Sequence, residues 1–294
     1  MQRRNNRVAY AFLLPFTLVF FLFTFVPILS AIVLSFTNFN MLQTPYWIGL
    51  SNYVRMFFAD DVFLIALRNT LLFALLTGPV GFVVSLLLAW FVNELKPALR
   101  AFLVTVFYAP TLAGNVYFIW KIIFSGDAYG LINGWLMSLG ILNEPVQWLY
   151  DSRYNLWIVV IVLLWLSLGL GFLAFVAGMQ TVNRDLYEAG AIDGIRNRFQ
   201  EFWYITLPQI VPQMTFASVI VLSAAFSVGV QSAELTGFPS TDYSAHTLVL
   251  HIQDFGYTRF EMGYASALSV ALFVIVVLFW RLVDRLFTKL GGDL

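Results

Sequence analysis

The sequence is poor in charge and contains no cysteine. Only 11% of its 294 residues are charged, whereas soluble domains average about 25%. So few charged groups could not cover the surface of a soluble protein of this size, which excludes a cytosolic enzyme, a disordered tail and a coiled coil. The lack of cysteine excludes disulfides and thiolate chemistry. The balance of 16 acidic and 16 basic residues argues against a nucleic-acid-binding protein, which normally has a basic excess.

Apolar residues dominate instead. Hydrophobic residues make up 60% of the chain, and the mean hydropathy is +0.82, so we predict an integral membrane protein. Six runs without a charged residue are each at least 19 residues long, close to the roughly 20 that a helix needs to cross a bilayer. Because these runs are continuous rather than alternating, they predict helices and not barrel strands. The predicted spans are residues 9–36, 69–93, 101–124, 155–180, 207–233 and 262–284.

A seventh charge-free run, residues 128–143, is short for a span and rich in helix breakers. It has 16 residues, among them Gly130, Asn133, Gly134 and Gly140. We expect an interfacial or re-entrant helix on the outer side of the membrane. No low-complexity linker or clear internal repeat interrupts the chain, so residues 1–294 are predicted to form one membrane domain.

The distribution of Lys and Arg predicts the orientation. With six spans and a cytoplasmic N-terminus, eleven basic residues lie in cytoplasmic segments and four in outer loops, which is the positive-inside pattern. Both termini are then cytoplasmic. Arg3, Arg4 and Arg7 precede an apolar run as in a signal peptide, but that run is longer than the about 7–15 residues of a signal h-region. We expect it to be retained as the first span.

The predicted cytoplasmic loop between the fourth and fifth spans, residues 181–206, is long, polar and patterned. Asp185 followed by Glu188 fits a helix N-cap with its capping-box partner. Gly194 is placed to end this helix in a left-handed conformation. The helix would carry an apolar stripe at three-residue spacing, formed by Leu186, Ala189, Ile192 and Ile195.

The end of the same loop contains Thr206 and Pro208, which fit the cap and the first turn of the fifth span. From the residues alone the loop has two interpretations, a connector on the membrane surface or a docking element for a partner. Gly190 and Gly194 favour the second, because they weaken so short a helix unless something packs closely against it.

The chain carries no energy source of its own. Its three lysines, Lys96, Lys121 and Lys289, do not follow a glycine as in a phosphate-binding loop, so we expect no ATPase site and assign no catalytic residue. Apart from Lys121, near a boundary, and Arg281 and Asp284 in the last turn of the sixth span, the predicted spans contain none of the charged residues that ion-coupled transporters use. An ion-coupled secondary transporter of a neutral solute stays as the alternative, because backbone carbonyls can also bind sodium.

His246 and His251 are the only histidines, and carboxylates lie near them in the sequence. Such a pair could bind a metal. However, the chain offers no cysteine and the two histidines lack the i,i+4 spacing of a helical site. We expect both to lie on a polar outer loop, and we predict no metal site.

Several segments resemble binding-protein-dependent ABC importer permeases. Glu188-Ala189-Gly190, Asp193-Gly194 and Ile205-Thr206-Leu207-Pro208 are similar to the cytoplasmic signature of that family, in which Glu-Ala-Ala and three variable residues precede Gly, with Ile-x-Leu-Pro nearby. Gly190 departs from it, since the family usually has Ala there. The maltose-type (MalF-like) first permease of the sugar-importer branch is also similar in further segments: Phe12–Pro15, Leu34–Thr37, Trp47–Tyr53, Asn69-Thr70, Tyr108–Pro110 and Tyr129–Asn133.

This resemblance implies an all-α integral membrane protein with the type I permease fold of ABC importers, six transmembrane helices and a cytoplasmic coupling helix. It implies uptake of a mono- or oligosaccharide delivered by an extracytoplasmic solute-binding protein. The implied complex contains a second homologous permease subunit and a cytoplasmic ATPase dimer in a bacterial cytoplasmic membrane. ATP and magnesium would bind to that ATPase, and this chain would hold no cofactor.

The resemblance also implies which residues act. The 185–198 helix would sit in a groove on the ATPase, with a charged hydrogen bond from Glu188 and a helix end shaped by Asp193. The expected ATPase-coupling residues are Asp185, Glu188, Ala189, Gly190, Asp193, Gly194, Leu207 and Pro208.

Sugars bind through hydroxyl hydrogen bonds and stacking on aromatic faces, so a sugar path mixes polar and aromatic groups. The candidate substrate-path residues within the spans are Asn115, Tyr117, Trp120, Ser223, Ser227 and Gln231. Each also has a plain alternative role in linking packed helices. Gly169 and Gly171 are expected to allow close helix packing rather than to touch substrate.

Overall fold

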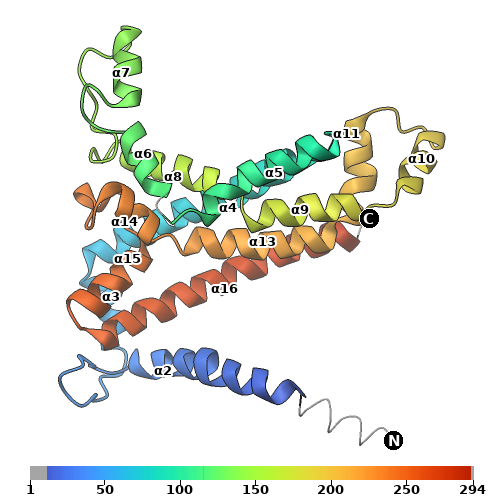
Figure 1. Ribbon diagram of the computed structural model, residues 1–294. Coiled ribbons are helices and arrows are strands. Elements are labelled where there is room, and N and C mark those ends of the chain that lie inside the picture. The colour runs from blue at the N-terminus through green and yellow to red at the C-terminus, as the bar shows by residue number, and fades with distance from the viewer. Residues whose placement is uncertain (1–11, 115, 293–294) are drawn as a thin grey trace, which may run out of the picture. The chain divides into compact units, whose positions relative to one another are not determined.

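The computed structural model describes residues 12–114 and 116–292 (Figure 1). These residues form helices joined by turns, with one isolated antiparallel bridge between Thr37 and Trp47. Within them, four helices are long and apolar enough to cross a membrane, and two bent helix pairs bring the number of spans to six if each pair crosses once. The fold is therefore that of an all-α, multi-pass membrane protein, as predicted.

The first helix is described from Phe12 and runs to Leu34. The elements in chain order are η1 (Phe21–Phe25), α2 (Val26–Leu34), α3 (Ser51–Phe58), α4 (Asp61–Asn93), α5 (Pro97–Leu112), α6 (Val116–Ile123), α7 (Leu131–Ser138), α8 (Asn155–Leu166), α9 (Leu170–Thr181), α10 (Arg184–Ile192), α11 (Arg198–Glu201), η2 (Phe202–Thr206), α12 (Leu207–Gln209), α13 (Val211–Phe226), α14 (Val230–Thr236), η3 (Thr241–Tyr243), α15 (Leu248–Gln253), η4 (Asp254–Thr258) and α16 (Met262–Gly292).

The second span is longer than its charge-free run. It begins at Asp61 rather than at residue 69, because Asp60 supplies an N-terminal acceptor: its Oδ1 accepts a hydrogen bond from the Phe63 N–H at 3.0 Å. Arg68, the charged residue directly before the charge-free run, lies inside this helix. Charged residues limit the part of a helix that lies within the bilayer, but they do not stop the helix from continuing outside it.

The third and fifth predicted spans are not single continuous helices. α5 and α6 are bent by 93°, across a link that includes Asn115, which lies outside the described residues. The fifth is bent by 80° at Ile210, between Pro208 and Pro212. Proline lacks the N–H for the helix ladder and clashes with the preceding turn, so a bend is expected there.

The chain forms two compact units, residues 1–63 with 251–274 and residues 64–250 with 275–294. In the first unit, the buried Asn52 of α3 donates hydrogen bonds to the carbonyls of Ser35 at 2.8 Å and Thr37 at 3.0 Å. These bonds satisfy carbonyls just beyond the end of α2, where a helix leaves its last acceptors unpaired.

In the second unit, α13 packs along α9. A Cβ at Gly171 would lie 3.1 Å from Val221 Cγ2, and a Cβ at Gly178 would lie 2.8 Å from Gln213 Cγ. The two backbones approach closely because these positions lack side chains, which confirms the close helix packing expected at Gly171. The adjoining buried core includes Leu86, Ala89, Phe172, Phe175 and Ala217, from α4, α9 and α13.

Candidate functional site

The loop expected to dock a partner forms helix α10, and its N-cap is Asn183. The backbone of Asn183 is extended (φ −65°, ψ 131°), and its Oδ1 accepts a hydrogen bond from the Asp185 N–H at 3.1 Å. The predicted capping box of Asp185 and Glu188 is therefore wrong, because a residue two positions earlier supplies the acceptor. Asp185 lies instead in the first turn, where a carboxylate suits the positive end of the helix dipole.

The C-terminal end of α10 is as predicted. Asp193 follows the last helical residue, and its N–H donates to the Ala189 carbonyl at 3.0 Å. Gly194 has a φ of +97°, and the next N–H, that of Ile195, donates to the Gly190 carbonyl at 2.9 Å. A left-handed glycine that returns the chain to the last helical carbonyls is a common helix stop.

Three of the four residues of the predicted apolar stripe are exposed, and the face of α10 that packs is a different one. The fourth residue, Ile195, lies beyond the end of α10 and is half-buried. Ile192 is 88% exposed and Leu186 38%, and Ala189 is exposed as well. Gly190 is buried, and a Cβ there would lie 2.7 Å from Ile205 Cδ1. A short helix that leaves its apolar residues open in this way offers a surface to a partner.

The helix that follows α10 begins earlier than predicted. Asn197 caps α11, because its Oδ1 accepts a hydrogen bond from the Gln200 N–H at 2.8 Å. The π-turn η2 and then α12, which contains Pro208, continue from it. Thr206 is therefore inside the helical segment, and the cap predicted at Thr206 is wrong. Leu207 packs against the core formed by α9 and α13.

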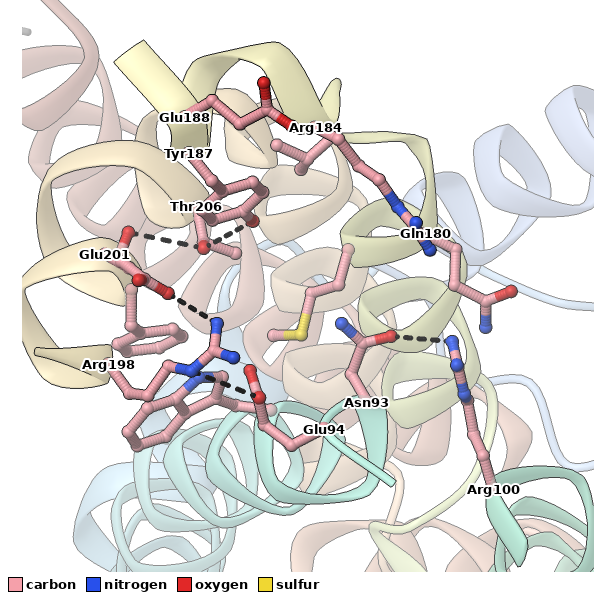
Figure 2. Close-up of a pocket in the computed structure, with 14 residues that line it drawn as sticks. Asn93, Glu94, Arg100, Gln180, Arg184, Tyr187, Glu188, Arg198, Glu201 and Thr206 are labelled. Atoms are coloured by element: carbon pink, nitrogen blue, oxygen red, sulfur yellow. Dashed lines mark hydrogen bonds and ion pairs between the residues drawn. The ribbon is translucent and has the colours of Figure 1, made fainter. Parts of the chain in front are cut away.

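A cavity of about 590 Å³ lies between α10, α11 and the ends of α4, α5 and α9 (Figure 2). Its charged lining residues are Glu94, Arg100, Arg184, Glu188, Arg198 and Glu201. Figure 2 shows Arg198 on one side with the two acidic residues that it pairs with, and Arg100 on the other side. With three acidic and three basic side chains, the lining has no net formal charge.

Internal contacts hold two of these arginines. Arg198 lies 2.7 Å from Glu201 Oε2 and 3.6 Å from Glu94 Oε2. Arg100 Nη1 donates to Asn93 Oδ1 at 3.0 Å, which ties the end of α4 to the first turn of α5. The cavity thus has a fixed polar wall behind α10, and Glu188 lies at its edge with an exposed side chain.

The candidate substrate-path residues do not share one cavity. Tyr117 and Trp120 of α6 pack against the apolar core of the second unit. Ser223 lines a largely apolar cavity of about 260 Å³ between α13 and α16, and the Ser227 hydroxyl donates to the Ser223 carbonyl at 2.6 Å. Asn115 lies outside the described residues. These assignments stay predictions.

Gln231 lines a different cavity, of about 250 Å³, where three helices are interrupted. Thr111 lies beside the end of α5, Ser167 and Gly169 separate α8 from α9, and Gln231 lies in the first turn of α14. Interrupted helices present free backbone groups inside a membrane, and transporters place binding sites there. Sequence reasoning missed Thr111 and Ser167, although Pro110 and Gly169 beside them were signals of the breaks.

Residues 81–291 match the family described as "Binding-protein-dependent transport system inner membrane component". The chain belongs to this family. Among its relatives, the "Probable ABC transporter permease protein YesP" of Bacillus subtilis (strain 168) is 32% identical, over 93% of this chain and 88% of that protein. The arabinooligosaccharides permease AraP of the same organism is 30% identical, over 97% and 88%.

A solved structure is similar along the whole length of this permease. It is that of a bacterial ABC transporter involved in the import of the acidic polysaccharide alginate, with a TM-score of 0.80, 26% identity, and coverage of 97% of this chain and 96% of that one. The fold is therefore the type I permease fold that the sequence predicted, and the choice between an ABC permease and an ion-coupled transporter is decided in favour of the permease.

Outside α10, two of the segments of this permease that resemble the family hold parts of the fold together. Asn69 Nδ2 donates to the carbonyls of Tyr243 and His246, both at 2.9 Å. Thr70 Oγ1 accepts a hydrogen bond from the Leu248 N–H at 2.8 Å. The Asn-Thr pair therefore fixes a distant loop to α4, because each side chain satisfies backbone groups that have no helix partner.

Asn133 has the same kind of role in the seventh charge-free run. It lies in the eight-residue helix α7 and is fully buried. Its Nδ2 lies 3.0–3.1 Å from three carbonyl oxygens, those of Ser125, Asp127 and Val146, which share its two N–H donors. Its Oδ1 accepts a hydrogen bond from Trp148 Nε1 at 2.7 Å. One amide thus closes the hairpin around α7, which has far fewer residues than a span needs.

Of the two histidines expected on a polar loop, His246 lies in a loop, His251 lies inside helix α15, and both are buried. His246 and His251 are each 2% exposed. His251 Nε2 lies 2.9 Å from Asp60 Oδ2, which also accepts a hydrogen bond from the Tyr264 hydroxyl at 2.6 Å. Burial would raise the pKa of Asp60, but the hydrogen bonds with His251 and Tyr264 outweigh it and hold that pKa well below its usual range. The part of the chain that the structure describes contains no group of three His, Asp or Glu side chains suited to a metal ion.

Proposed function

We propose that this permease is the membrane-spanning subunit of an ATP-driven carbohydrate importer in a bacterial cytoplasmic membrane, with both termini in the cytoplasm. A second homologous permease completes the path, and an extracytoplasmic binding protein delivers a mono- or oligosaccharide. A cytoplasmic ATPase dimer binds the ATP and magnesium. The family description supports the binding protein, and the relatives for arabinooligosaccharides and alginate support a carbohydrate as the substrate.

The exposed face of α10 carries the ATPase-docking part of this proposal. Leu186 and Ile192 form an open apolar strip, and the exposed carboxylates of Asp185 and Glu188 flank it. An apolar centre with a charged rim is the usual anatomy of a protein interface. Because α10 joins α9 to α11 with short connections, a displacement of a docked ATPase reaches two spans at once.

The cavity at the three helix breaks is the best candidate for this subunit's part of the sugar path. Thr111, Ser167 and Gln231 line it with neutral hydroxyl and amide groups. Such groups can exchange hydrogen bonds with sugar hydroxyls without placing a charge in the membrane. The remaining path candidates, Tyr117 and Trp120 among them, are proposed as neighbours of this route.

The docking assignment is tested by reversing one charge. In the Glu188→Lys variant we expect ATPase co-purification and ATP-driven uptake to fall at least about tenfold, because a reversed charge in an interface costs several kcal/mol. Uptake is measured in proteoliposomes that contain the complex and its binding protein, with labelled arabinotriose, lactose and an alginate trisaccharide as probes. Glu144→Lys, at another exposed glutamate, is the matched control.

Two results would contradict the proposal. Wild-type ATPase binding and uptake in the Glu188→Lys variant would show that α10 is not the docking element. ATP-dependent uptake of none of the three probes would count against a carbohydrate substrate of these kinds.

A further inference from the structure

The inner face of α10 meets the start of the fifth span at two contacts on adjacent residues. The Tyr187 hydroxyl lies 2.9 Å from Thr206 Oγ1. Beside it, Gly190 lies directly over the Ile205 side chain, with 2.7 Å between an added Cβ and Ile205 Cδ1. Ile205 and Thr206 are buried and end the π-turn η2. The support of α10 therefore converges on a single turn of helix.

The polar contact continues into the backbone. Thr206 Oγ1 also lies 3.4 Å from the Glu201 carbonyl, to which it can only donate. The Tyr187 hydroxyl is then the donor to Thr206. Two consecutive hydrogen bonds therefore run from the Tyr187 O–H through the Thr206 O–H to the Glu201 C=O. Figure 2 shows this chain along one wall of the cavity. It links the middle of α10 to both ends of η2.

Thr206 is well placed to pass a displacement onward. It directly precedes α12 and Pro208, and the 80° bend that leads into α13 follows within a few residues. The Gly190–Ile205 contact is apolar and non-directional, so it resists compression and allows sliding. The hydrogen bond is directional, and its Thr206 end is buried, so it holds the register of α10 on η2.

We propose that Tyr187 is a positioning residue that transmits movement of α10 to the fifth span through the Thr206 hydroxyl. This inference rests on the proposed docking of an ATPase on the exposed face of α10. Without the hydrogen bond, α10 follows the ATPase while α12 and α13 lag behind it. The result is ATP hydrolysis that is no longer matched by movement of the span.

The absence of cysteine makes the test direct. Spin labels are attached to Ala191→Cys in α10 and Phe216→Cys in α13, both exposed positions outside the apolar stripe. The labelled permease is assembled with its partners in proteoliposomes, and the distance between labels is measured without nucleotide and with ATP, magnesium and vanadate. In the wild type we expect one unchanged distance, because the two helices move together.

In the Tyr187→Phe variant we expect a second distance to appear with ATP and vanadate. The ratio of the population with the wild-type distance to the population with the second distance should fall about 3- to 10-fold, the worth of one net hydrogen bond. Thr206→Val should act in the same way, and the double variant should be no worse than either single one. Thr206→Ser, which keeps the hydroxyl, should behave as the wild type.

Co-purification and ATPase activity separate this inference from the proposed function. We expect Tyr187→Phe to keep both near wild-type levels, since the exposed face is untouched. An unchanged distance in Tyr187→Phe, or additive losses in the double variant, would overturn the role of Tyr187. Failure of the ATPase to co-purify with the wild-type chain would instead overturn the docking of an ATPase itself.

Discussion

The exposed helix α10 and the buried cluster at Asp60 use carboxylates in opposite ways. Asp185 and Glu188 of α10 are exposed, and Glu188 also lies at the edge of the cavity behind this helix. The Asp60 side chain is only 9% exposed and is shared by His251 and Tyr264. In a chain with so little charge, the buried carboxylate stabilises the fold through hydrogen bonds, and the exposed ones stay available to a partner.

The contrast between buried and exposed carboxylates predicts that the largest loss of stability follows a substitution at Asp60. The Asp60→Ala change leaves the buried His251 side chain and the Tyr264 hydroxyl without this acceptor, which should cost about 3 kcal/mol of unfolding free energy. We expect the thermal unfolding midpoint of the purified protein in detergent to fall by roughly 5–10 °C.

Asp61→Ala is the control for that change, because Asp61 is the next residue and is exposed. Its midpoint should stay within about 2 °C of the wild type, as for most surface substitutions. Equal midpoints for the two variants would show that the Asp60 cluster does not stabilise the fold.

Acid should remove part of the same contribution. Because the pKa of Asp60 is held below its unfolded value of about 3.9, the stabilisation is present above that pH and is lost as the pH falls below it. Asp60→Asn has no carboxylate to protonate. The midpoint difference between wild type and Asp60→Asn should therefore be constant from about pH 7 to pH 5 and narrow below about pH 4. A difference that stays constant to about pH 3 would contradict this account.

The smallest effect is expected in α10. Asn183→Ala removes the N-cap, which is worth about 1 kcal/mol of helix stability. Since α10 packs mainly through one face, the loss should be local: hydrogen exchange at residues 185–187 should speed up about fivefold, with no change in the thermal midpoint. Asn143→Ala, at an exposed asparagine, should change neither. A drop of the midpoint in Asn183→Ala would show that α10 is part of the cooperative core.

Some details of the site could be predicted from local sequence. Gly194 was placed correctly as the end of α10, because a left-handed residue after a short helix strongly favours glycine. The N-cap predicted at Asp185 is wrong. Asn183 and Asp185 are both suitable cap residues, and only the backbone angles show that Asn183 is the one used. The sequence also did not predict that most of the apolar stripe is exposed, since an apolar stripe normally marks the buried face of a helix.

Contacts between residues far apart in the sequence could not be predicted from it. Asp60 and His251 are 191 positions apart, and nothing in either neighbourhood marks the other. The breaks that bring Thr111, Ser167 and Gln231 to one cavity lie in three separate helices. A proline or a glycine lies at each break, but these residues do not indicate which breaks lie at the same depth in the membrane.

The sequence by itself determined the class of protein, the apolar segments that can span a membrane and the position of helix α10. These depend on hydropathy and charge summed over about 20 residues, and on a local signature in one loop. The tertiary structure alone decided which face of α10 is free, which carboxylates are buried and which hydroxyl links α10 to the fifth span. These depend on single contacts between residues far apart in the chain, where one ångström decides whether a hydrogen bond forms.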